Sequence, residues 1–130
     1  MVPLAAKPEP VVVDLAQTAL VVVDMQNAFL SKGGMFDLAG FDISGAEKAI
    51  EVNRRVLATT RAAGVKVIYL QMTYSADLSN AGGPVSPNYH KELGMVMMRE
   101  RPELAGKLLV EDTWDGQIVD ELAPGPDDKV

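Results

Sequence analysis

The chain has 130 residues, of which 48% are hydrophobic, and this length suits one domain with a core of its own. Twelve basic residues stand against eighteen acidic ones without a basic cluster, so the net charge of −6 argues against binding of nucleic acid or of an anionic membrane. The absence of cysteine excludes disulfides, thiolate metal sites and a cysteine nucleophile within these residues. The N-terminus lacks a signal-peptide pattern and no apolar stretch approaches the roughly 18 residues of a membrane helix, so we expect a cytoplasmic protein.

The first part of the chain predicts an extended arm followed by a buried strand. Residues 1–10 contain three prolines, and residues 11–14, "VVVD", form either a short strand or the end of an arm over residues 1–17. Residues 19–24, "ALVVVD", are apolar without alternation, which is typical of a central parallel strand covered on both faces. A buried helix is the alternative, and three consecutive β-branched valines argue against it.

The following residues predict a helix and a second strand. Residues 25–44 contain three glycines in "SKGGMFDLAGFD" and are interpreted as a long loop. Ser44 and Glu47 have the spacing of a capping box, so we expect a helix that begins there and ends at Gly64. Residues 65–72, "VKVIYLQM", predict a second strand, which completes a strand–helix–strand unit with parallel strands.

The rest of the chain carries weaker patterns. Residues 73–92 are rich in Gly, Pro, Ser and Asn, and a loop of this length is usually functional or disordered. The methionine run at 94–98 is expected in the core, with a subunit contact as the alternative. Residues 112–122 predict a short helix, and residues 127–130 resemble the start of another strand. Together these patterns predict a single α/β domain over residues 1–130, with a parallel sheet flanked by helices.

Asp24 stands out because it ends the apolar strand. Ligands of open parallel sheets bind beyond the carboxyl ends of the strands, where Met72 and Tyr74 of the second strand are also expected. The alternative is that Asp24 caps the turn that follows, and its position alone does not decide between the two. Neither a phosphate-binding glycine motif nor a serine nucleophile elbow occurs, and the single histidine, His90, cannot build a typical catalytic zinc site.

Six segments together carry a resemblance to a known family. They are "ALVVVDMQNAFL", "GGMFDLAGFD", "RAAGVKVIYLQ", "AGGPVSPNYHKE", "RERPELAGKLL" and "TWDGQIVDELAPGPDDKV". In these segments the chain, from about Thr18 onward, resembles the isochorismatase-like cysteine hydrolases, and among them the ureidoacrylate amidohydrolases of bacterial pyrimidine degradation. The resemblance implies a parallel sheet wrapped by helices, in agreement with the patterns above.

The resemblance also implies a catalytic set of an aspartate, a lysine and a cysteine nucleophile. Asp24 matches the family aspartate, which acts as the base that takes the thiol proton. The family lysine and cysteine are expected beyond Pro126, on segments that these residues do not include. The resemblance therefore implies that the chain is an apparently truncated N-terminal half, inactive alone, which associates with a second copy or with its missing half.

Substrate contacts in the family come from the loops after the first two strands. By position the candidates here are Phe29, Met35, Met72, Tyr74, Asn80 and Asn88. Loop packing or turn formation is the alternative for each of them. The Asp-x-His motif of metal-dependent relatives is absent, so neither a metal nor another cofactor is expected.

The function implied by the resemblance is hydrolysis of a C–N amide or ureido bond. The substrate is a small carbamoyl compound of the ureidoacrylate kind, cleaved through a thioacyl intermediate. The alternative is a non-catalytic or degenerate α/β domain that serves as a packing or oligomerisation module.

Overall fold

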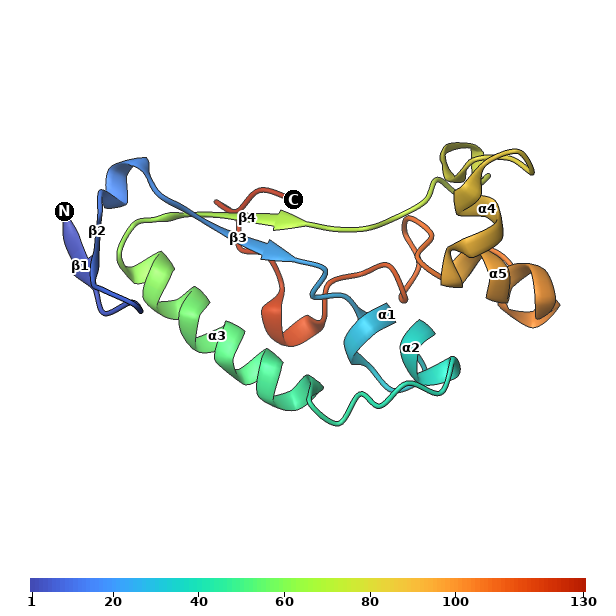
Figure 1. The fold of residues 1–130 in the computed structure, drawn as a ribbon, viewed down its shortest axis with the longest axis horizontal. Helices are drawn as coiled ribbons and strands as arrows, with labels where there is room; N and C mark the ends of the chain where they lie inside the picture. The colour runs from blue at the N-terminus through green and yellow to red at the C-terminus, as the bar shows by residue number, and fades with distance from the viewer.

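The computed structural model describes all 130 residues and has a two-stranded parallel sheet near its middle (Figure 1). Strand β3 (Ala19–Val23) pairs with β4 (Lys66–Leu70), with Leu20 opposite Val67. Helix α3 (Ala46–Ala62) connects the two strands. The predicted strand–helix–strand unit is confirmed, and β4 ends two residues before the predicted boundary.

The predicted capping box of α3 is wrong. The residue before the helix is Gly45, and no side chain caps the first turn. The Ser44 backbone N–H instead donates to Asp42 Oδ1 at 2.9 Å, so Ser44 belongs to an Asx turn ahead of the helix. At the other end, Gly64 has φ +69°, a conformation that suits glycine, and it ends the helix as predicted.

Helix α3 and the short 3₁₀ turn η4 (Asp120–Leu122) cover one face of the sheet. The buried side chains there are Val22, Leu57, Val67, Tyr69, Val119 and Leu122. On the opposite face, Val21 is 47% exposed, and Val23 and Leu70 are each 52% exposed. The parallel α/β architecture is thus confirmed, but the expectation that β3 is covered on both faces is wrong. Side chains alternate across a strand, so one covered face buries only every second valine.

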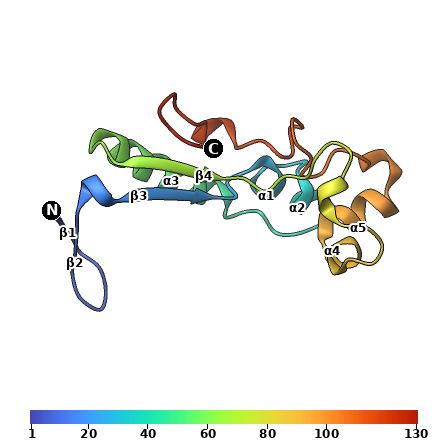
Figure 2. The same ribbon diagram turned by 90° about the horizontal axis from the view of Figure 1, so that it is seen from above.

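The N-terminal arm is an exposed hairpin. Strands β1 (Val2–Leu4) and β2 (Val11–Val13) pair antiparallel and are followed by the 3₁₀ turn η1 (Leu15–Gln17). Asp14 caps this turn by accepting a hydrogen bond from the Ala16 N–H at 3.0 Å. Figure 2 shows the hairpin projecting from one end of the molecule, beyond the start of β3.

Short helices occupy the two segments that were predicted to be loops. Helices α1 (Asn27–Leu30) and α2 (Met35–Leu38) follow β3. The 3₁₀ turn η2 (Ser79–Ala81) and helix α4 (Pro87–Lys91) lie in the second predicted loop. Each contains only three to five residues, too few to show a helical repeat of apolar positions.

Helix α5 (Leu93–Glu100) and the 3₁₀ turn η3 (Pro102–Leu104) lie at the end of the molecule farthest from the hairpin (Figure 1). They belong to a second apolar cluster, whose buried residues are Ala28, Met35, Tyr74, Ala81, Met95, Met97, Met98, Leu104, Leu108, Leu109 and Val110. This second cluster includes the buried residues Met95, Met97 and Met98. The prediction that the methionine run lies in the core is therefore confirmed.

The helix predicted over 112–122 is wrong except for its last turn, η4. Its backbone is engaged with α1 instead of with itself. The Asp115 carbonyl accepts from the Ala28 N–H at 2.8 Å, and the Gln117 carbonyl accepts from the Asn27 N–H at 2.8 Å. Carbonyls that accept from another segment are not available for a helical turn.

The C-terminal residues lie beside β4, at the edge of the sheet opposite β3 (Figure 2). The Tyr69 N–H donates to the Lys129 carbonyl at 2.7 Å, and the Lys129 N–H donates to the Val67 carbonyl at 3.0 Å. The expected start of another strand is confirmed. Asp128 holds this segment in place by accepting hydrogen bonds from the Arg61 guanidinium and from the Gly125 N–H.

Asp115 is a buried carboxylate without a cationic partner. One of its oxygens accepts from the Met35 N–H at 2.9 Å and the other from the Leu109 N–H at 2.8 Å, so it connects α2 to the loop after η3. Burial raises the pKa of Asp115, and the two N–H donors partly oppose that rise.

Replacing Arg61 by Met is expected to lower the urea midpoint at neutral pH. The Arg61 guanidinium lowers the pKa of Asp128 below its ordinary value of 3.8. The ion pair therefore stabilises the fold above that pH, and its contribution is lost as the pH falls through the lowered folded value. The difference between parent and variant should shrink as the pH falls below 3.8. As a control, Arg54→Met breaks the exposed pair with Glu51 and should have little effect. A difference that does not vary with pH would contradict the assignment.

Replacing Asp115 by Asn is expected to lower the free energy of unfolding by about 1–3 kcal/mol, because an amide can accept from only one of the two buried N–H groups. Urea unfolding at neutral pH measures this loss. The control is Asp112→Asn on the same loop, where the aspartate is exposed with φ +60°, a conformation that asparagine also tolerates. Equal stability of the two variants would rule out the structural role of Asp115.

Candidate active site

Asp24 lies at the carboxyl end of β3, as predicted. Its N–H donates to the Leu70 carbonyl at 3.0 Å, which makes it the last backbone link between the two strands. The Asp24 side chain is exposed, and no hydrogen bond in the structure engages its carboxylate.

The backbone of Asp24 is in the left-handed region, with φ +55°. This conformation is uncommon outside glycine, although Asp and Asn adopt it more readily than other residues. It costs of the order of 1–3 kcal/mol for an ordinary residue and persists where the surrounding structure enforces it. A strained aspartate at the tip of a parallel strand is a candidate functional group with a geometric reason for its position.

Gln26 connects the ends of the two strands through its side chain. The amide is fully buried; it donates to the Met72 carbonyl at 2.8 Å and to the Gly116 carbonyl at 2.7 Å. Its oxygen accepts from the Met72 N–H at 2.8 Å. A third segment is therefore fixed at the same point as β3 and β4.

A second polar side chain fixes the start of α1. Asn27 donates from Nδ2 to the Trp114 carbonyl at 2.8 Å, and its Oδ1 accepts from the Ser31 hydroxyl at 2.7 Å. Gln26 and Asn27 were not among the predicted site residues. The available signal was two amide side chains directly after a strand, since polar groups that become buried must be hydrogen-bonded.

Four of the six predicted substrate contacts lie in the second apolar cluster. They are Phe29, Met35, Met72 and Tyr74. Met35 and Tyr74 are 2% and 4% exposed, whereas Phe29 and Met72 are partly buried at the margin of the cluster. Met72 is the one that the structure connects to the strand tip, because its backbone binds the Gln26 amide.

The two predicted asparagines lie farther along the chain. Asn80 is exposed, and its Oδ1 accepts from the Ser75 N–H at 2.9 Å, which closes the loop after β4. Asn88 donates to the Tyr74 hydroxyl at 3.1 Å and to the Ala81 carbonyl at 2.8 Å. Burial raises the pKa of the Tyr74 phenol. Figure 1 shows α4, which carries Asn88, at the end of the molecule, so the six residues do not converge on Asp24.

The main cavities of the molecule are lined by residues other than Asp24. No group of three or more His, Cys, Asp or Glu side chains is placed to hold a metal ion. His90 is exposed, and its Nε2 lies 2.6 Å from the Pro84 carbonyl. None of the helices has both the length and the apolar character needed to cross a membrane.

Known proteins are similar in sequence to nearly the whole of this chain. It is 54% identical over 127 residues to the ureidoacrylate amidohydrolase RutB of Rhizobium rhizogenes, a match that covers 98% of this chain and 52% of that protein. The ureidoacrylate amidohydrolase RutB of Agrobacterium fabrum is also 54% identical, over 96% of this chain and 55% of its own length. The chain thus spans about half the length of the curated relatives it matches.

Two solved structures match the fold of this chain. A cysteine hydrolase from Pseudomonas syringae pv. phaseolicola matches 90% of this chain and 46% of its own, with a TM-score of 0.64 and 26% identity. An isochorismatase family protein from Desulfovibrio vulgaris matches 85% of this chain and 49% of its own, with a TM-score of 0.61 and 28% identity. The family model of the isochorismatase domain matches residues 18–130, and the chain therefore belongs to the isochorismatase family.

Proposed function

We propose that the whole protein is an amidohydrolase that cleaves a C–N bond of a small ureido or carbamoyl compound of the ureidoacrylate kind. The observation that carries this proposal is the 54% identity to ureidoacrylate amidohydrolases along nearly the whole chain. The position of Asp24 at the tip of a parallel strand supports it, because such tips are where ligands bind in open parallel sheets.

In the proposed reaction Asp24 is the base. Its carboxylate takes the proton of a cysteine thiol, and the thiolate attacks the carbonyl carbon of the substrate. The C–N bond then breaks and the amine leaves with a proton, which gives a thioacyl intermediate that water hydrolyses. The 130 residues contain no cysteine, so the proposed thiol must come from outside them. The unengaged carboxylate of Asp24 supports this role, since both of its oxygens are free to accept a proton.

We also propose substrate contacts near the strand tips. Phe29 and Met72 are partly buried residues after β3 and β4, and an apolar contact from either one fits this location. Met35 and Tyr74 are buried in the second apolar cluster. For Asn80 and Asn88, a substrate contact stays a prediction from the family pattern. The proposed substrate is a small polar metabolite, for which the cytoplasm is the proposed compartment.

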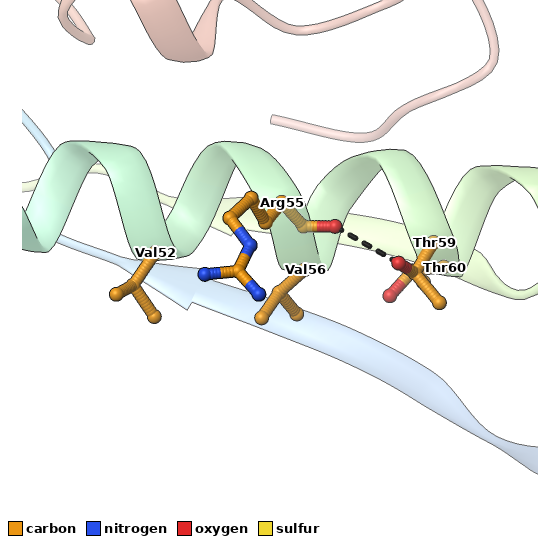
Figure 3. A pocket seen from close by; sticks show the side chains of 5 residues that line it. All are labelled: Val52, Arg55, Val56, Thr59 and Thr60. Atoms are coloured by element: carbon orange, nitrogen blue, oxygen red, sulfur yellow. Dashed lines mark hydrogen bonds between the residues drawn. The ribbon is translucent and has the colours of Figure 1, made fainter.

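A packing role is the second candidate, and the exposed apolar surface favours it. Val21, Val23 and Leu70 form an exposed apolar face on the sheet, which we call the outer face. On α3, Val52 and Val56 are 47% and 43% exposed and line a shallow groove on its surface (Figure 3). Parallel sheets are normally covered on both faces, so the outer face is a surface for a second copy or for another part of the whole protein.

Asp24→Asn in the whole protein is expected to lower kcat for a ureido substrate by about 100- to 10,000-fold, the usual contribution of a general base. Asparagine tolerates the left-handed backbone at this position, so the thermal unfolding midpoint should stay near that of the parent protein. Release of the cleaved amine measures kcat, and calorimetry measures the midpoint.

Asp24→Gly removes the carboxylate and also relieves the strain of the left-handed backbone, so it distinguishes an effect on turnover from an effect on stability. Glycine adopts φ +55° without penalty, so this variant should be at least as stable as Asp24→Asn and equally inactive. Parental turnover in either variant would refute Asp24 as the base.

The 130-residue chain alone is expected to self-associate through the outer face. Sedimentation velocity should show species above 13.9 kDa whose proportion grows with concentration. Replacing Val21, Val23 and Leu70 by Thr keeps residues that suit strands and should restore the monomer. Val85→Thr is the control, because Val85 is fully exposed in a loop and its replacement should change nothing. A parent chain that is monomeric at every concentration would contradict this expectation.

A further inference from the structure

The hydrogen-bonded pairing of β3 and β4 continues past the point where the backbone of β3 turns away. The last backbone link is the Asp24 N–H to the Leu70 carbonyl, at 3.0 Å. The left-handed turn at Asp24 then takes the chain out of register, and the Gln26 N–H folds back onto the Asp24 carbonyl at 2.8 Å. The next residue of the other strand that needs a partner is Met72.

The Gln26 side chain supplies that partner. Its amide gives one donor and one acceptor to the carbonyl and the N–H of Met72, both at 2.8 Å. A backbone peptide of a continuing strand offers the same pair of groups. The side chain thus replaces the backbone that the turn at Asp24 removed, and the second N–H of the amide fixes Gly116.

The residue types nearest to glutamine in size or chemistry do not meet these requirements. Glutamate has no donor and would place a negative charge against the carbonyls of Met72 and Gly116. Asparagine has both groups but is one methylene shorter. Methionine has a similar length and no amide, so it would leave the carbonyl and the N–H of Met72 without their partner, whereas the Gly116 carbonyl would keep its hydrogen bond from the Gln71 side chain.

This arrangement determines where the backbone of Asp24 lies, and with it the point from which the carboxylate projects. The carboxylate accepts no hydrogen bond in the structure, so the contribution of the fold to its placement is the position of the Cα–Cβ bond, which the backbone of Asp24 sets. That backbone is held on one side by Leu70 and on the other by the turn that Gln26 completes. A misplacement of about 1 Å can lower a rate 100-fold, so a loose strand tip affects chemistry directly.

We propose that Gln26 is a positioning residue that orients Asp24 by completing the β3–β4 pairing with its side-chain amide. This inference rests on the proposed function of Asp24 as the base. Gln26 does not contact the substrate in this proposal; it acts through the backbone of Asp24.

The test compares Gln26→Met and Gln26→Glu with the parent, in the whole protein. Each variant is expected to lower kcat for the ureido substrate about 10- to 100-fold per folded molecule while KM changes less than about twofold. Both variants should also lower the thermal unfolding midpoint, since buried polar groups lose their partner.

Tyr69→Phe is the matched control for loss of stability. The Tyr69 hydroxyl donates to the Leu122 carbonyl at 2.8 Å, a buried hydrogen bond between distant segments that does not involve the strand tip. The variant should unfold at a lower temperature and keep the parental kcat per folded molecule. If the Gln26 variants lose stability and keep kcat as Tyr69→Phe does, Gln26 is only structural and the inference is wrong.

A double variant separates this inference from the proposed function. In an Asp24→Asn background, Gln26→Met should lower stability as before but cause no further loss of kcat, because its effect passes through the carboxylate. A full additional loss would show that Gln26 acts independently of Asp24. Parental kcat in Asp24→Asn alone would overturn the proposed base, whereas an inactive Asp24→Asn with an active Gln26→Met would overturn only the positioning role.

Discussion

The hydrogen bonds of the Gln26 amide hold the end of the sheet together. The backbone pairing of β3 and β4 stops where Asp24 adopts a left-handed conformation. Without the amide, both backbone groups of Met72, which are partly buried, would lose their partner. The side chain thus extends the pairing of the two strands beyond the last backbone link, between Asp24 and Leu70. The loops that carry the candidate site and the second apolar cluster both start from these ends.

The exposed valines and the exposed candidate base have different physical causes. The alternation that buries Val22 under α3 leaves Val21 and Val23 exposed. Asp24 has the parity of Val22, and a strand that continued through it would turn its side chain toward the covered face. The left-handed backbone at Asp24 ends the strand geometry at that residue, and its side chain is exposed.

The elements that the sequence predicts well are those whose signals are local. Runs of β-branched residues mark β3 and β4, and Gly64 marks the end of α3. Asp24 was found because it terminates such a run. The helix expected over 112–122 fails because its carbonyls bind the N–H groups of α1. Gln26 was missed for a similar reason: its partners lie 46 and 90 residues away, and no neighbouring residue indicates them.

Asp115 and Asp24 differ in role: one stabilises the fold, and the other is the candidate catalytic base. Asp115 is buried and has a raised pKa, features that often mark catalytic acids and bases. Each of its oxygens, however, accepts a backbone N–H, from Met35 or from Leu109, and these two bonds give the carboxylate a structural role between α2 and the loop after η3. Asp24 has an exposed carboxylate without any such partner and a backbone fixed by its neighbours. A general base must be within reach of the proton that it takes, and of the two aspartates the exposed Asp24, with its fixed backbone, meets this condition better than the buried Asp115.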